Sequence, residues 1–229
     1  MYRMTRGVNS PRRYDATRRR EAADRTRAEV IAAGSRLFLA DGFAATTVTA
    51  IATASHVSQE TFYKSFGSKA GLVRAIWARA LEGNGDVPAE QRSDAMQATE
   101  HDPHEIIRRW GEFIVEVAPR VVPILLLMKS AASSDPQLAE LAAEVDEQRL
   151  RRMARNARTL HDRRQLRQGV TLREARDILW TYSSPELFEL LVLRRGWSIQ
   201  RFAGFVSDQL ISALLPSASE RPSSSRAGG

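Results

Sequence analysis

Two short helical segments joined by a tight turn lie within residues 46–69, and they restrict the fold more than any other feature. The first segment runs from about Thr47 to Ala54, and the second from about Ser58 to Lys64. Ser58 can cap the second segment, because its hydroxyl can accept a backbone N–H that has no partner inside the helix. The sequence here therefore predicts a pair of helices whose geometry is set by the turn between them.

The apolar residues of this pair are spaced so that Ile51, Val57 and Phe62 form a buried wedge between the two helices. Such a wedge holds two helices at a fixed angle, which is the arrangement of a helix-turn-helix. The second helix of that motif is narrow enough to enter the major groove of DNA. Polar residues without an apolar role remain on its outer sides, and these are Gln59, Thr61, Tyr63 and Lys64.

Helices are also predicted for the rest of the chain. Apolar residues recur at helical spacing from about Thr17 to Leu214, and no stretch alternates polar and apolar residues as a strand does. Capping residues precede several of these stretches: Ser68, Asp102 with Pro103, Asp135 with Pro136, Thr171 with Glu174, and Ser198. The sequence therefore predicts an all-α protein, with an N-terminal three-helix helix-turn-helix domain followed by a larger α-helical domain.

Breaks in the helical pattern indicate where the parts begin and end. We expect a flexible basic arm over residues 1–15, the helix-turn-helix domain over 16–67 and a helical domain over 68–215. Within the helical domain, residues 84–101 are polar and show no apolar stripe, which predicts a mobile linker. Residues 216–229 are rich in Ser, Gly and Pro, which predicts a disordered tail.

The positive charge is concentrated in the first third of the chain. Residues 1–80 carry 14 Lys and Arg against 6 Asp and Glu, a net charge of +8, whereas residues 81–229 have a net charge of −1. A basic surface that neutralises DNA phosphates has this distribution. A solvated basic tail has it too, since six of the arginines lie in residues 3–19. Charge alone leaves both interpretations open.

Composition and motifs exclude several classes of site. The chain has no cysteine, and so it has neither a disulfide nor a thiolate metal cage. His101 and His104 are spaced as metal ligands can be, but no third ligand accompanies them, and we expect no metal and no cofactor. The sequence contains no glycine-rich phosphate loop and no Gly-x-Ser-x-Gly motif. We therefore expect no catalytic residues and no enzymatic activity.

No apolar run approaches the roughly 18–20 residues that span a bilayer, and the longest, residues 121–128, contains a proline. The basic N-terminus has no apolar stretch behind it, so we do not expect a signal peptide. We expect a cytoplasmic protein that has no membrane partner.

The segment TTVTAIATASHVSQETFYKSFGSK, residues 46–69, strongly resembles the TetR family of repressors. The resemblance extends from about Arg25 to Trp77, and it includes LFLADGF before the pair of helices and GSKAGL after it. It implies a helix-turn-helix domain that binds double-stranded DNA.

The resemblance also implies roles for individual residues. The family has Thr, Tyr and Lys where this chain has Thr61, Tyr63 and Lys69, which implies that these three contact DNA mostly at phosphates. Gln59 and Lys64 would then be the candidates for base edges. The two capping residues, Thr47 and Ser58, complete the set, and Thr47 would also hold a phosphate. The expected DNA-binding residues are therefore Thr47, Ser58, Gln59, Thr61, Tyr63, Lys64 and Lys69.

Two positions depart from the family pattern. His56 occupies the turn, where the family usually has glycine, and a left-handed backbone there would cost a residue with a side chain about 1 kcal/mol. Ser65 stands where the family often has an aromatic residue or histidine, so that one phosphate contact is lost. Neither departure changes the expected fold.

Proteins of this family use their C-terminal part for dimerisation and for binding an effector, so the resemblance implies both for residues 68–215. Apolar residues surround the segment 187–193 almost completely, and a partner subunit is the expected cover. A central helix within a single subunit is the alternative. The residues expected to form the homodimer are Leu187, Phe188, Leu191, Phe202, Val206 and Leu210.

Pro119 and Pro123 interrupt an apolar stretch, and we expect them to break or kink a helix there. A broken helix packs imperfectly, which predicts an effector pocket with the walls Trp110, Phe113, Ile114, Val117, Val121, Leu125, Met128 and Trp180. These walls are large and apolar, so the effector would be a small apolar or aromatic molecule. The alternative is that the same residues simply fill the core.

Together these features predict a sequence-specific transcriptional regulator that binds a palindromic operator as a homodimer. We expect a repressor that a small-molecule effector releases from its operator. Two other functions fit the sequence. One is a helical enzyme or ligand carrier with a vestigial DNA-binding head, and the other is a protein that coats DNA without sequence preference.

Overall fold

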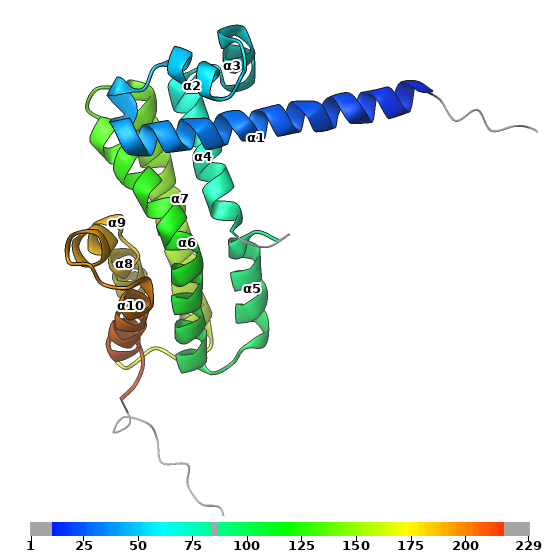
Figure 1. Ribbon diagram of the computed structural model, residues 1–229. Coiled ribbons are helices and arrows are strands. Elements are labelled where there is room, and N and C mark those ends of the chain that lie inside the picture. The colour runs from blue at the N-terminus through cyan, green and yellow to red at the C-terminus, as the bar shows by residue number, and fades with distance from the viewer. Residues whose placement is uncertain (1–10, 84–86, 218–229) are drawn as a thin grey trace, which may run out of the picture. The chain divides into compact units, whose positions relative to one another are not determined.

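The computed structural model describes residues 11–83 and 87–217, and within these residues all regular elements are helices (Figure 1). The all-α prediction is confirmed over this part of the chain. None of the described helices is long and apolar enough to cross a membrane. The chain divides into two compact units, of which unit 1 ends at Ile76 and unit 2 begins at Trp77.

Unit 1 contains the two predicted short helices and the longer helices before and after them. Its elements are α1 (Pro11–Ala45), α2 (Val48–Ala54), α3 (Gln59–Phe66) and the first part of α4 (Lys69–Glu82). Their apolar faces form one core, which includes Val30, Ala33, Phe38, Phe43, Ile51, Ala52, Phe62, Leu72, Val73 and Ile76. Leu72 of α4 packs so closely on Gly34 of α1 that a side chain at residue 34 would collide with it. The start of α4 therefore belongs to unit 1, whereas the sequence predicts a boundary after residue 67.

Helix α1 begins at Pro11, inside the segment for which the sequence predicts a flexible arm. The helix there is explained by the helix propensity of its own residues, since residues 11–29 are rich in Arg, Ala and Glu. Such a helix needs no apolar stripe, which is why the pattern of apolar residues does not reveal it. Residues 1–10 of the predicted arm lie outside the described residues.

The end of α1 is set by a glycine and a threonine. Gly42 has a positive φ of +82°, and a last turn leads to Ala45. The buried hydroxyl of Thr46 then donates to the carbonyl of Gly42 at 2.8 Å. The same carbonyl also accepts the backbone N–H of Thr46 at 3.3 Å, so that Thr46 closes the end of the helix with two hydrogen bonds.

Lys69, at the start of α4, ties this turn to the rest of unit 1. Its Nζ donates to the carbonyls of Phe43 (2.7 Å) and Thr46 (2.9 Å), and it lies 4.2 Å from the centre of the Phe43 ring. Hydrogen bonds from a charged donor are stronger than those between neutral groups. The side chain of Lys69 is therefore committed to the structure of unit 1.

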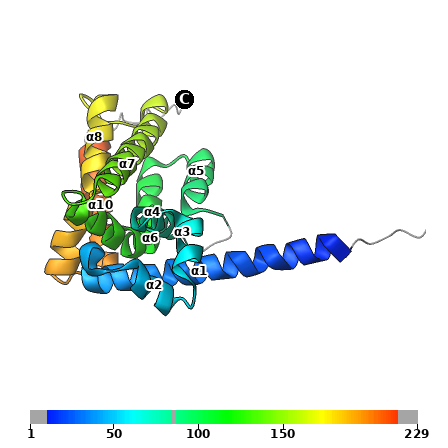
Figure 2. The ribbon, with the colours of Figure 1, turned by 90° about the horizontal axis from the view of Figure 1, so that it is seen from above.

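Unit 2 is built around one long helix, α6. Its elements are the rest of α4, α5 (Ala89–Thr99), α6 (Pro103–Ala131), α7 (Pro136–Asp162), α8 (Leu172–Tyr182), α9 (Pro185–Phe188), the π-helical turn η1 (Glu189–Arg194) and α10 (Ile199–Leu214). Helix α6 lies beside α7 and α10 (Figure 1 and Figure 2). The core between these helices includes Ile106, Ile107, Trp110, Val122, Leu160, Leu179, Phe188, Phe202, Val206, Leu210 and Leu214.

Helices of unit 2 begin at the capping residues that the sequence predicts. The side chains of four of these residues each accept a backbone N–H in the first turn: Asp102, Asp135, Thr171 and Ser198. At Thr171 the capping box is complete, because Glu174 accepts hydrogen bonds from its backbone N–H and its hydroxyl. These bonds favour the ionised carboxylate and lower the pKa of Glu174.

Helix α5 occupies residues 89–99, inside the segment 84–101 for which the sequence predicts a mobile linker. The structure differs from the prediction because α5 is held largely by polar contacts, which leave no apolar stripe. Its buried residues are Ala89, Ser93, Met96 and Gln97. Residues 84–86, and residues 218–229 of the predicted tail, lie outside the described residues.

Helix α6 continues through Pro119 and Pro123, where the sequence predicts a break or kink. Each proline removes one backbone donor and leaves a carbonyl one turn earlier without its usual partner. Between them, the guanidinium of Arg120 donates to the carbonyl of Glu116 at 2.9 Å. Apolar residues on both sides of the prolines are buried. The packing of α6 against its neighbours therefore outweighs the local preference for a break.

We expect Lys69→Met to destabilise unit 1, because two carbonyls would lose a charged donor inside the fold. Each such bond contributes about 1.5–3 kcal/mol, so hydrogen exchange of the α2 and α3 amides should become at least ~10-fold faster. Lys64→Met is the matched control, since Lys64 is exposed on α3, and it should leave the exchange rates unchanged. Equal exchange rates in the two variants would show that Lys69 does not hold unit 1 together.

Candidate nucleic-acid interface and ligand cavity

Both helices of the predicted motif begin at a side-chain cap. Thr47 precedes α2, and its hydroxyl accepts the N–H of Ala50 at 3.0 Å. Ser58 precedes α3 and accepts the N–H of Thr61 at 3.1 Å. The hydroxyls of Ser58 and Thr61 also share a hydrogen bond of 2.9 Å. Two hydroxyls are thereby held at the N-terminus of α3.

The turn between the two helices passes through His56, whose φ of +56° is in the left-handed region. This confirms the conformation expected at a position where glycine is usual, and it costs about 1 kcal/mol. Around it, the N–H of Val57 donates to the carbonyl of Ala52 (3.0 Å), and the buried hydroxyl of Ser55 donates to that of Ile51 (2.7 Å). These bonds hold the turn in place.

The wedge predicted from the sequence is present. Ile51 and Phe62 are fully buried, and Val57 is half-buried. The ring of Phe62 also packs against those of Tyr63 and Phe66, with ring centres 5.5 and 5.6 Å apart. Because Phe62 faces the core, the residues beside it on α3 face outward, and Tyr63 is 50% exposed.

The predicted DNA-binding residues fall into two groups by exposure. Five are exposed: Thr47, Ser58, Gln59, Tyr63 and Lys64. Thr61 and Lys69 are half-buried, and the ammonium of Lys69 faces carbonyls of the protein itself. The Nε2 of Gln59 donates to the hydroxyl of Thr49 on α2 at 3.0 Å. Thr49 is an exposed member of this polar surface that sequence analysis missed, because its contact joins two different helices.

A contact from α1 holds the other end of α3. The guanidinium of Arg27 donates to the carbonyl of Ser65 (2.9 Å) and lies 4.5 Å from the centre of the Phe66 ring. A positive charge near a helix C-terminus is favourable because of the helix dipole. Arg27 and Ser65 are 38 residues apart, so no local pattern reveals the pair. Helix α3 is thus fixed by its cap at one end and by Arg27 at the other.

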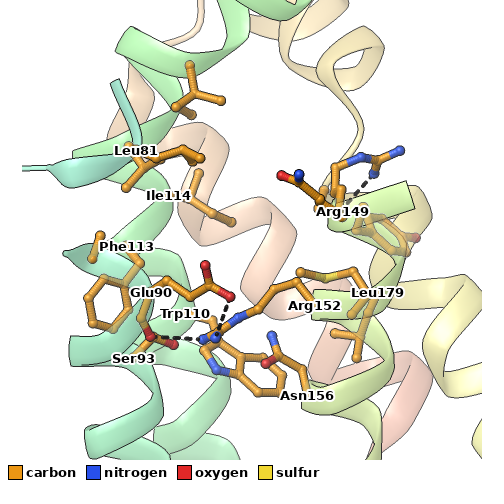
Figure 3. A pocket seen from close by; sticks show the side chains of 18 of the residues that line it. Leu81, Glu90, Ser93, Trp110, Phe113, Ile114, Arg149, Arg152, Asn156 and Leu179 are labelled. Atoms are coloured by element: carbon orange, nitrogen blue, oxygen red, sulfur yellow. Dashed lines mark hydrogen bonds and ion pairs between the residues drawn. The ribbon is translucent and has the colours of Figure 1, made fainter. Parts of the chain in front are cut away.

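Unit 2 contains a cavity of about 450 Å³ whose walls come from α4 to α8 and α10 (Figure 3). Its apolar walls include Trp77, Leu81, Trp110, Phe113, Ile114, Val117, Val121, Leu125, Met153 and Leu179. Figure 3 shows Phe113 and Ile114 on one side of the cavity, and Arg149 and Leu179 on the other. A cavity of this size takes a drug-sized molecule.

The structure brings most of the predicted pocket residues together. Six of them line this cavity: Trp110, Phe113, Ile114, Val117, Val121 and Leu125. Met128 is fully buried in the core instead. Trp180 lies with its ring 4.5 Å from the guanidinium of Arg149 and also does not line the cavity. The predicted cause is wrong, because α6 is not broken and the cavity lies along a continuous helix.

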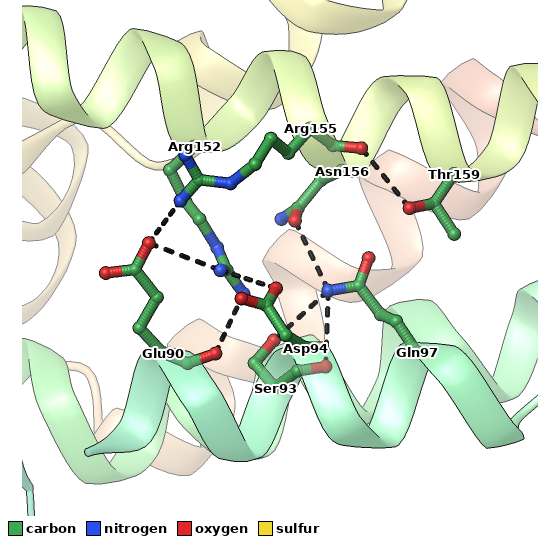
Figure 4. A network of polar contacts seen from close by, with 8 residues as sticks. All are labelled: Glu90, Ser93, Asp94, Gln97, Arg152, Arg155, Asn156 and Thr159. Carbon is green, nitrogen blue, oxygen red and sulfur yellow. Dashed lines mark hydrogen bonds and ion pairs between the residues drawn. The ribbon is translucent and has the colours of Figure 1, made fainter.

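Polar side chains of α5 and α7 also line the cavity, and sequence analysis missed them. The two helices are joined by ion pairs (Figure 4). Arg152 of α7 lies 2.6 Å from Asp94 and 3.3 Å from Glu90 on α5, and Arg155 also pairs with Glu90. The paired residues are 58 to 65 positions apart in the sequence. The spacing of residues along the sequence therefore cannot reveal these ion pairs.

A buried amide network lies next to these ion pairs. The Nε2 of Gln97 is 3.4 Å from the Oδ1 of Asn156 and 3.3 Å from the carbonyl of Ser93. Within the described part of the chain, the Oε1 of Gln97 and the Nε1 of Trp110 are buried without a hydrogen-bond partner. Trp110 is 7% exposed and lines the cavity. One wall residue of the cavity therefore carries an unsatisfied donor.

Helix α5 is also tied to α6 by a charged residue. Arg92 pairs with Glu116, and this hydrogen bond raises the pKa of Arg92 above its ordinary value. The same guanidinium lies 5.5 Å from the centre of the Phe113 ring. Charged side chains thus hold α5 to both of the long helices beside it.

The histidines considered as metal ligands lie at the start of α6. His104 is 3.4 Å from Asp102, whose side chain caps that helix. Among residues 11–83 and 87–217, no three His, Cys, Asp or Glu side chains are grouped so that they could hold a metal ion.

Most residues predicted to form the dimer are buried within unit 2 itself. Four of them belong to its core: Phe188, Phe202, Val206 and Leu210. Leu187 and Leu191 are half-buried. Leu190 (51% exposed) and Leu193 (54% exposed) both lie on η1. A single chain therefore leaves an apolar surface at η1.

Residues 30–76 match the family described as bacterial regulatory proteins, tetR family. This span contains α2, α3 and the parts of α1 and α4 that pack on them. No curated protein matches the chain.

Solved structures with the same fold cover most of the chain. The complex of SmeT with triclosan aligns with a TM-score of 0.67 at 19% identity, over 86% of this chain and 95% of that one. NalD, the secondary repressor of the MexAB-OprM multidrug efflux pump in Pseudomonas aeruginosa, aligns with a TM-score of 0.64 at 20% identity, over 85% and 98%. The flavonoid-responsive regulator FrrA aligns with a TM-score of 0.53 at 23% identity, over 85% and 100%.

The family match and the helix-turn-helix geometry concern the same residues of unit 1. The solved structures share the fold of a helix-turn-helix unit followed by a larger helical unit. Residues 30–76 thus match the tetR family of bacterial regulatory proteins in sequence, and the chain shares the fold of the solved structures.

Proposed function

We propose that the protein is a dimeric transcriptional repressor that binds a palindromic operator through α3 and is released when a small molecule occupies the cavity. The observation that best supports this is the outer face of α3, where Gln59, Tyr63 and Lys64 are exposed beside a buried wedge. Their polar groups suit the donors and acceptors of the major groove. Gln59 suits adenine and Lys64 suits guanine, whereas Tyr63 suits a phosphate.

Release by a ligand requires a connection between the cavity and the DNA-binding helices, and α4 supports one. Its residues Leu72 and Ile76 pack in the core of unit 1, and its residues Trp77 and Leu81 line the cavity of unit 2. A ligand that moves this wall favours a different spacing of the two α3 helices in the dimer. Half-sites of such operators lie about 34–36 Å apart, so a changed spacing lowers the affinity for DNA.

Selection of bound duplexes from a random DNA pool tests the DNA-binding proposal. We expect recovery of a palindrome, with binding that weakens steeply as the salt concentration rises. Gln59→Ala should relax the preference at one position of each half-site by about 1–3 kcal/mol, whereas Tyr63→Phe should weaken binding to all sequences alike. Equal affinity for the recovered duplex and a random one would reject a sequence-specific regulator and support a protein that coats DNA.

A homodimer is supported by the apolar surface at η1. Five large apolar or aromatic residues are strongly exposed in the described chain, and two of them, Leu190 and Leu193, lie on this one turn. Scattered apolar residues are normal on a surface, but neighbouring ones mark an interaction site. A two-fold axis through η1 would bring the same leucines of both subunits together and remove them from water.

Light scattering of the double variant Leu190→Glu, Leu193→Glu tests this interface. We expect a dimer for the unmodified protein at micromolar concentration and a monomer for the variant, because the dimer would bury unpaired carboxylates. Leu39→Glu is the control, since Leu39 is 48% exposed on α1, and it should remain dimeric. A variant that stays dimeric at the same concentration would remove η1 from the interface.

The chemistry of the cavity favours an uncharged, mainly aromatic ligand that carries a hydrogen-bond acceptor. Its walls are largely apolar, and the charge of Arg152 is already paired with two carboxylates. The unpartnered Nε1 of Trp110 costs about 1–3 kcal/mol while it stays unsatisfied, and an acceptor on the ligand would recover this. The triclosan of the SmeT complex and the flavonoid response of FrrA support a small organic ligand.

Two probes of nearly the same shape test for that acceptor. Fluorene has no acceptor, whereas 9-fluorenone carries a carbonyl, and we expect the protein to bind 9-fluorenone about tenfold more tightly through Trp110. Trp110→Phe should abolish the difference and keep the binding of fluorene. Trp197→Phe changes a tryptophan outside the cavity and should alter neither affinity. Equal binding of both probes by the unmodified protein would reject this role of Trp110, and no binding of either would reject the ligand site.

A further inference from the structure

Residues 17–29 of α1 form a stretch of helix without buried residues. Of residues 17–29, twelve are exposed and Thr26 is half-buried, and Val30 is the first buried residue of the helix. Figure 1 shows this part of α1 extending past α2 and α3. A helix in a folded protein is usually stabilised by packing one apolar face. This stretch has no such face, and Arg19 and Arg20 on it are exposed.

The arginines of this stretch lie on two opposite sides of α1. Arg20 precedes Phe38 by 18 residues, which is five full turns, and so the two share one side of the helix. Arg19 precedes Val30 by 11 residues, about three turns, and lies on that side as well. Val30 and Phe38 are buried against the rest of unit 1. Arg19 and Arg20 therefore continue the side of α1 that packs on the DNA-binding helices.

The other two exposed arginines face away. Arg18 and Arg25 precede Arg36 by 18 and 11 residues, and Arg36 is exposed. They lie on the outer side of α1, opposite to its core. The helix thus carries two pairs of arginines with the same charge and exposure but with opposite directions.

Arg27 shows where the inner side of the helix points. It lies two turns after Arg20 on the same side, and its guanidinium contacts Ser65 and Phe66 at the C-terminal end of α3. Arg20 is therefore about 10 Å farther along α1 than the residue that touches α3. The major groove is about 12 Å wide. A guanidinium about 10 Å beyond the end of a helix that lies in the groove can therefore reach the phosphates on the edge of that groove.

We propose that Arg19 and Arg20 bind phosphates of the DNA backbone beside the groove that α3 enters. This inference rests on the proposed function, because it adds a second contact to the same complex. Residues 17–29 carry five arginines against three acids, and guanidinium groups pair well with phosphate. Contacts of this kind add affinity and fix the register of α3, and they read no bases.

The experiment compares the double variant R19Q, R20Q with its matched control R18Q, R25Q. Both remove two exposed positive charges from the same helix, and circular dichroism checks that the helix content is equal. Binding to the duplex recovered by selection is measured from 50 to 200 mM salt. Each lost phosphate contact lowers the slope of log K against log salt by about 0.9. We expect the slope of R19Q, R20Q to fall by about 1.8 and that of R18Q, R25Q to stay near that of the unmodified protein.

Equal slopes for the two double variants would overturn the proposal, whether both fall or neither does. A common fall would mean that the helix acts only through its overall charge. Failure of the proposed function gives a different result, because the unmodified protein would then show no preference for the recovered duplex. A preference for the recovered duplex that persists in all three proteins, together with equal slopes for the two double variants, leaves the regulator intact and removes the contact.

Discussion

Two prolines remove backbone donors from the middle of α6, and the helix still runs unbroken from Pro103 to Ala131 because much of its surface is buried. Helices α7 and α10 pack along it, and the cavity lies along the same helix. The cost of a proline inside a helix, about 3 kcal/mol, is offset by this packing. A break of the helix at Pro119 would separate Trp110 from Leu125, which both line the cavity. The continuity of α6 is thus the condition for both the core and the cavity of unit 2.

Unit 1 separates the residues that hold α3 from those that α3 displays. Lys69 and Arg27 are both cations near α3, but their charges face carbonyls of the protein itself. Gln59 and Lys64 face outward and remain available to DNA. A cation in a DNA-binding motif can therefore act by positioning the helix, and its variant would weaken binding without having touched a base or a phosphate.

The features that sequence analysis predicted correctly are those whose cause lies within a few residues. Ser58 caps the helix that follows it, and His56 adopts the left-handed turn because the chain must reverse there. The polar part of the cavity lining could not be predicted, since Asn156 meets its partners only when distant helices pack together. Trp110 and Met128 show the same limit. Both continue the apolar stripe of α6, but one lines a cavity and the other is fully buried, and distant helices decide which.

Helix α5 closes one side of the cavity, yet it is joined to α7 largely by charged side chains near the surface. Ion pairs of this kind weaken as salt rises, whereas the apolar contacts of α6 do not. A short helix held in this way opens locally at a lower free energy than the core beside it. Entry of a ligand would then be timed by the opening of α5. Ionic strength would change the rate at which the cavity fills more than the strength with which the ligand is finally held.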